Sequence, residues 1–115
     1  MNPVRARRGR PKGSATRDRV GEILSVIDRG TGYDVFRIYR EVFGSITSRA
    51  IYYNLHQGVL LDEFELDEIT VESGEYSWGA KAEKKYYKPG RKARRITDED
   101  TKARIAQSWV RIRGE

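Results

Sequence analysis

Three stretches in the first half of the chain carry apolar residues at helical spacing. They are Val20, Ile23, Leu24 and Ile27, then Val35, Ile38, Tyr39, Val42 and Phe43, then Ile51 and Leu55. Positions i, i+3, i+4 and i+7 lie on one face of an α-helix, so each stretch predicts an amphipathic helix with a buried side.

Polar residues and glycines mark the ends of these helices. Thr16 and Asp34 are the expected N-caps of the first two, and the third is expected to begin at Thr47 or Ser48 and to run to His56. The glycines expected to end the three helices are Gly30, Gly44 and Gly58.

After the third helix the pattern changes to a period of two. The apolar residues that alternate with acids are Phe64, Leu66, Ile69 and Val71. This alternation predicts a strand, and its change of phase at 67–68 predicts a bulge. Gly74 and Gly79 are expected in a loop, and residues 81–88 are expected to form the returning strand.

A fourth helix is predicted near the C-terminus. Thr97 and Asp100 form a T-x-x-D capping box in front of it. Its apolar stripe consists of Ile105, Trp109 and Ile112. Three such residues cannot hold an isolated helix, so it must pack on the domain or on a second copy. We predict a homodimer with these three residues at the interface.

The element order indicates the fold class. Three short helices, a two-stranded hairpin and an additional C-terminal helix predict an α+β winged helix-turn-helix. Residues 1–15 are expected to be a disordered basic arm, 16–90 the DNA-binding domain, and 91–115 a basic linker with the last helix.

Charge is concentrated at the start of the chain of 115 residues. Among the first nineteen residues the bases are Arg5, Arg7, Arg8, Arg10, Lys12, Arg17 and Arg19, against one acid, Asp18. This excess equals the net charge of +6 of the whole chain, so the remainder is neutral. A basic arm on a charge-balanced body predicts a polyanionic partner, nucleic acid above all.

The composition argues against several other classes. The chain has no cysteine and a single histidine, His56, so no metal site, cofactor or enzymatic centre is expected. No apolar run is long enough to span a bilayer, and no signal peptide is evident. We expect a cytoplasmic, nucleoid-associated protein without an evident small-molecule effector.

Three segments together resemble a known family. They are 31–34 (TGYD), 45–66 (SITSRAIYYNLHQGVLLDEFEL) and 84–87 (KKYY). The chain is similar over about residues 17–89 to winged-helix transcription regulators of the PadR/ArsR type from archaea and bacteria. The resemblance implies binding to double-stranded DNA. In the arm, residues 8–11 (RGRP) resemble the core of an AT-hook.

The expected DNA contacts fall into three groups. In the helix-turn-helix geometry, helix 47–57 enters the major groove, where Arg49 can bind guanine and Gln57 adenine. The helix contacts are Ser48, Arg49, Tyr53, His56 and Gln57. The arm contacts are Arg5, Arg7, Arg8, Arg10, Pro11 and Lys12, in a narrow minor groove or along phosphates. The wing and linker contacts are Lys81, Lys84, Lys85, Arg91 and Lys92.

The two arms of the hairpin carry opposite charge. Residues 62–75 hold seven acids and no base, whereas residues 81–95 hold eight bases and one acid. We expect Lys84 and Lys85 to pair with Glu65 or Asp67 across the strands.

Two other functions stay open, an RNA-binding or translation-associated protein and a protein-interaction module.

Overall fold

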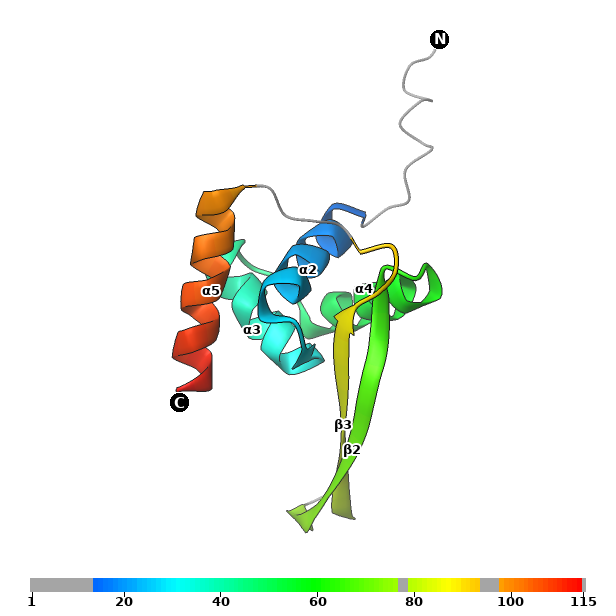
Figure 1. The fold of residues 1–115 in the computed structure, drawn as a ribbon. Coiled ribbons are helices and arrows are strands. Elements are labelled where there is room, and N and C mark those ends of the chain that lie inside the picture. The colour runs from blue at the N-terminus through cyan, green and yellow to red at the C-terminus, as the bar shows by residue number, and fades with distance from the viewer. Residues whose placement is uncertain (1–13, 77–78, 94–97, 115) are drawn as a thin grey trace.

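The computed structural model describes the backbone of residues 14–76, 79–93 and 98–114 (Figure 1). Its elements are α2 (Ser14–Ile27), β1 (Gly30–Thr31), α3 (Gly32–Val42), α4 (Ser48–Leu60), β2 (Phe64–Tyr76), β3 (Gly79–Pro89) and α5 (Glu99–Arg113). Over these residues the fold is α+β, with four helices and one three-stranded antiparallel sheet.

The core forms where the apolar faces of the helices meet. The three predicted stripes are confirmed as buried faces of α2, α3 and α4. The side chains with no exposed surface are Val20, Ile23, Leu24, Val35, Ile38, Ile51, Leu55 and Ile105. Burying each side chain of this size contributes about 1.5–3 kcal/mol, so the shared core holds the helices together.

The sheet contains a strand that the sequence pattern did not reveal. Its order is β1-β3-β2, and β1 pairs with β3 through Gly30 opposite Tyr87 and Thr31 opposite Tyr86. A strand of two residues is too short to show alternation. Gly30 therefore lies in this strand and does not end α2. That helix ends at Ile27, and Asp28 adopts the left-handed backbone conformation with φ of 70°.

Several helix boundaries differ from those predicted. Thr16 lies inside α2, which already includes residue 14 of the predicted arm. Thr31 is the N-cap of α3, and Asp34 completes a reciprocal capping box with it. Helix α4 begins at Ser48, one of the two predicted starts, and Thr47 is its N-cap. Asp98 caps α5, whereas Thr97 lies outside the described residues.

Gly58 was wrongly predicted to end α4, which continues to Leu60. A Cβ atom at this position would lie 2.1 Å from the ring of Phe64, the first residue of β2. The glycine therefore serves packing, because it lets the ring of Phe64 lie directly on the helix. The ring is almost completely buried there.

The β2–β3 hairpin projects far from the helices (Figure 1). The predicted bulge is confirmed by a shift of register between Leu66 and Glu68. The loop prediction is wrong for Gly74 and Gly79, because β2 passes through the first and β3 begins at the second. The hairpin is thus longer than its apolar alternation indicates.

Helix α5 packs against α3 and α2 of its own chain. Ile105 and Ile112 are buried in the core, and Trp109 packs partly buried against it. The buried hydroxyl of Ser108 donates a hydrogen bond of 2.7 Å to Glu41 of α3. The stripe predicted to lie at a dimer interface therefore packs on α2 and α3 of its own chain and completes their core.

We predict that Gly58→Ala destabilises the protein by about 1–3 kcal/mol, because the new methyl group collides with the buried ring of Phe64. Urea unfolding followed by circular dichroism measures the change. Gly21→Ala in α2 is the matched control, since a Cβ atom at Gly21 would lie 3.4 Å from the ring of Phe64, which is an ordinary contact distance. There alanine should be neutral or stabilise by up to about 1 kcal/mol. Equal free energies of unfolding for the two variants would contradict the packing argument.

Candidate nucleic-acid interface

One face of α4 presents a continuous polar and aromatic stripe. Thr47 caps the exposed start of this helix, where its Oγ1 accepts a hydrogen bond of 3.1 Å from the backbone amide of Ala50. The exposed stripe consists of Arg49, Tyr52, Tyr53 and His56. Ile51 and Leu55 on the other side are fully buried. The orientation predicted for this helix is therefore confirmed.

The remaining predicted residues of α4 border this stripe. Ser48 is exposed in the first turn, and Gln57 is half-buried. Tyr52 was not predicted, although its spacing from Arg49 and His56 places it on the same face. Its ring packs over Gly32 at the start of α3, where a Cβ atom would lie 2.2 Å from the ring. Only the tertiary structure reveals this second role.

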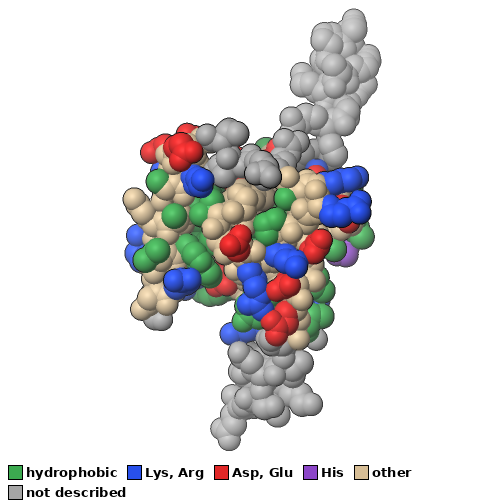
Figure 2. Space-filling model, viewed as in Figure 1, with side chains coloured by type: hydrophobic (Ala, Val, Ile, Leu, Met, Phe, Trp, Pro, Cys, Tyr) green, Lys and Arg blue, Asp and Glu red, His purple; other side chains and the backbone are tan. Residues whose placement is uncertain are grey.

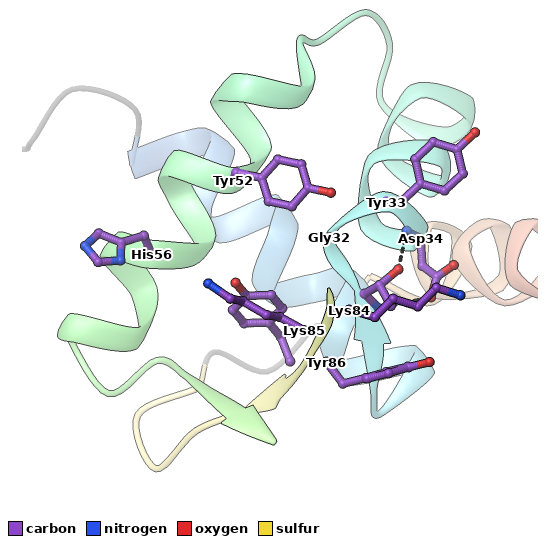
Figure 3. A pocket seen from close by; sticks show the side chains of 10 residues that line it. Gly32, Tyr33, Asp34, Tyr52, His56, Lys84, Lys85 and Tyr86 are labelled. Carbon is purple, nitrogen blue, oxygen red and sulfur yellow. Dashed lines mark hydrogen bonds between the residues drawn. The ribbon is translucent and has the colours of Figure 1, made fainter. Parts of the chain in front are cut away.

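A hollow of about 650 Å³ opens beside this stripe. Its walls come from three elements, as Figure 3 shows: Tyr33 and Asp34 from α3, Tyr52 and His56 from α4, and Lys84 and Lys85 from β3. The Tyr52 ring reaches from α4 toward the start of α3. The exposed face of α4 and the base of the hairpin therefore lie on the same side of the molecule.

The edge of β3 explains how neighbouring lysines reach one hollow. Strand β1 pairs with β3 only through Tyr86 and Tyr87 in the described register. Beyond them, on the β1 side, no strand of the described chain covers β3 at Lys84 and Lys85. Side chains from both faces of the strand consequently border the hollow at this edge.

Two tyrosines of the hollow, Tyr52 and Tyr87, are held in their neutral form. Burial and then the carboxylate of Asp34 raise the pKa of Tyr52. Burial raises the pKa of Tyr87, with Tyr52 as a second cause. At neutral pH their hydroxyl groups can therefore donate hydrogen bonds to an anion.

The acids at the base of the hairpin are paired within the domain. Arg29 Nε lies 2.6 Å from Asp67 Oδ2, and its Nη2 contacts Glu68. Its guanidinium group also stacks 4.0 Å from the ring centroid of Tyr86. Lys88 Nζ lies 3.4 Å from Asp67 Oδ1.

These ion pairs correct the predicted cross-strand partners. The register places Lys84 opposite Thr70 and Lys85 opposite Ile69. Glu65 and Asp67 instead have Lys88 as their partner across the strands, at 3.7 Å and 3.4 Å. Figure 2 shows acidic and basic side chains mixed on the surface at the base of the hairpin. Arg29 was missed because no local pattern links residues almost forty positions apart.

The structure describes the side chains of only some of the other predicted DNA contacts. Lys84, Lys85 and Lys92 are exposed, and Arg91 is exposed at 4.0 Å from Asp62. The side chain of Lys81 lies outside the described part of the chain. So do the arm residues Arg5, Arg7, Arg8, Arg10, Pro11 and Lys12.

An ion pair holds the start of α2 against the segment between α4 and β2. Arg17 Nε donates to Glu63 Oε1 at 3.0 Å, and both side chains are largely buried. Glu63 lies between α4 and β2, so this pair ties the first turns of α2 to the end of α4. The start of α2 therefore lies beside the C-terminal end of α4.

Comparison with known proteins finds no matching family model, no matching curated protein and no matching solved structure. Among the described residues, no helix is long and apolar enough to cross a membrane. The same part of the chain contains no group of three or more histidine, cysteine or acidic residues arranged to hold a metal ion.

We predict that the pKa of the Asp67 carboxyl group lies below its ordinary value and that Arg29→Gln raises this pKa. Its pKa is lowered first by the hydrogen bond from Arg29 and next by Lys88. Because the folded state has the lower pKa, the contribution to stability is present at neutral pH and is lost on acidification. Carbon-detected NMR of the side-chain carboxyl group measures this titration. An unchanged pKa in Arg29→Gln would refute the ion pair, and Arg113→Gln on α5 is the control.

Proposed function

We propose that this protein is a winged helix-turn-helix domain that binds double-stranded DNA and regulates transcription. Helix α4 is the recognition helix, the β2–β3 hairpin is the wing, and the basic N-terminal arm contacts phosphates or a minor groove. In this proposal the protein binds DNA and does not catalyse a reaction.

The order of elements supports the proposal. Helices α2, α3 and α4 share one core, and the hairpin follows α4 directly. A winged domain needs α3 and α4 as consecutive packed helices with one face of the second left open. The short strand β1 agrees with this arrangement, because it joins the hairpin to the turn before α3.

The proposal rests on one observation, which is that α4 and the hairpin face the same side of the molecule. Tyr52 and His56 of α4 line the same hollow as Lys84 and Lys85 of β3. A duplex lying against this side would meet the helix in its major groove and the hairpin beside it. Arg49 is exposed on the same stripe, so in this proposal its guanidinium group contacts base edges.

Electrostatics favours the same orientation. Acids at the base of the hairpin are paired with Arg29 and Lys88, which weakens their repulsion of phosphates. The recognition stripe itself holds one full positive charge, Arg49. Affinity through phosphates must therefore come from the hairpin, the linker and the arm.

We predict that Arg49→Ala weakens binding to the preferred duplex by about 1–3 kcal/mol and relaxes the base preference at one position. Fluorescence anisotropy with duplexes selected from a random pool measures both effects. Arg113→Ala in α5 is the control, because α5 lies across the helices from α4 (Figure 1). An equal loss on every sequence, or tighter binding to structured RNA, would contradict sequence-specific recognition of DNA.

We predict that removal of residues 2–13 weakens binding to all duplexes and reduces its salt dependence. The segment carries five basic side chains, and each phosphate contact contributes about 0.9 to the salt slope. This deletion leaves α2 complete, since the helix begins at Ser14. Replacing the five bases with glutamine keeps the length of the arm and should have the same effect. An unchanged slope in both variants would remove the arm from the interface.

A homodimer stays a prediction. Any two-fold contact would have to use a surface other than the α5 stripe, because Ile105 and Ile112 are buried in the monomer.

A further inference from the structure

The hollow between α3, α4 and β3 has the dimensions of a small-molecule site. Its volume of about 650 Å³ lies within the range of ligand pockets, which is about 300–1,000 Å³. Three separate elements build it, and the packing of Tyr52 on Gly32 fixes one wall. The site is therefore formed before any ligand enters.

Its lining combines aromatic rings with positive charge. Tyr33 and Tyr52 are about half exposed, so each keeps part of a ring available for stacking. Lys84 and Lys85 border the hollow, with Asp34 as its acid and His56 at its edge. Asp34 accepts the backbone amide of Thr31 at 3.0 Å, which engages its carboxylate in the cap of α3.

We propose that this hollow binds a single nucleotide unit, with its base against the tyrosine rings and its phosphate at Lys85. Stacking on aromatic side chains beside basic groups is the general way in which proteins hold unpaired nucleotides. The neutral hydroxyl groups of Tyr52 and Tyr87 can hydrogen-bond the phosphate or the edge of the base.

An unpaired nucleotide suits this geometry better than a duplex. In a duplex both faces of each base are covered by its neighbours, so tyrosine rings cannot stack on them. The site thus goes beyond the proposed reading of duplex DNA. Its nucleotide is either a free mononucleotide or one unit of a single strand, and both offer the same base and phosphate.

The test is calorimetric titration of the full-length protein with the four nucleoside 5′-monophosphates and with single-stranded hexanucleotides. We expect saturable binding that Tyr52→Leu weakens about tenfold or more through lost stacking. Lys85→Gln should weaken it about tenfold by removing a charged donor to the phosphate. Because Lys85 is exposed, Lys85→Gln should fold, and it still tests the proposal if Tyr52→Leu fails to fold.

Two matched variants separate this site from the duplex interface. Tyr53 is exposed on α4 but does not line the hollow, so Tyr53→Leu should leave nucleotide binding unchanged. Lys102→Gln on α5 is the control for loss of a charge. Since the titrations contain no duplex, their outcome is independent of the Arg49→Ala experiment.

Each outcome has one meaning. Binding of mononucleotides that depends on Tyr52 and Lys85 supports a free nucleotide, and binding of hexanucleotides alone with the same dependence supports a single strand. The proposal is overturned if no probe saturates below about 10 mM. It is equally overturned if Tyr52→Leu and Lys85→Gln both bind as the unmodified protein does.

Discussion

The contact of the Phe64 ring with two helices is the constraint on which the rest of the structure depends. The ring lies on Gly58 of α4 and touches the position of Gly21 in α2, and it is almost fully buried. Because Phe64 is the first residue of β2, this contact sets where the hairpin leaves the helices. A Cβ atom at Gly90, after β3, would lie 2.6 Å from the carbonyl oxygen of Asp62 and 3.0 Å from the backbone of Phe64, so both ends of the hairpin are held at one place.

The position of the hairpin then determines the surface beside α4. With the base of β3 held near Thr31, Lys84 and Lys85 border the hollow opposite Tyr52. The short strand β1 contributes to this placement, since it joins the strand to the capping box of α3. Both the proposed DNA interface and the proposed nucleotide site result from this arrangement of three elements around one hollow.

Charge is distributed so that the body contributes little net attraction to a polyanion. Arg29 and Lys88 pair with the acids at the root of the hairpin, and Arg17 pairs with Glu63 at the start of α2. Five of the six excess positive charges of the whole chain lie in the arm. In the proposed function the folded domain supplies geometry and the arm supplies a large share of the electrostatic affinity.

Local pattern by itself determined the helices, their buried faces, the bulged hairpin and the exposed side of α4. These features follow from periods of 3.6 and 2 residues, which are properties of neighbouring positions. Local pattern did not determine β1, the continuation of α4 through Gly58, the partners of Asp67 or the intramolecular packing of Ile105 and Ile112. Each of these depends on residues far apart in the chain, such as Arg29 with Asp67 or Gly58 with Phe64. Only the tertiary structure decides them, because the energy of a close contact depends on distance in space and not on separation along the chain.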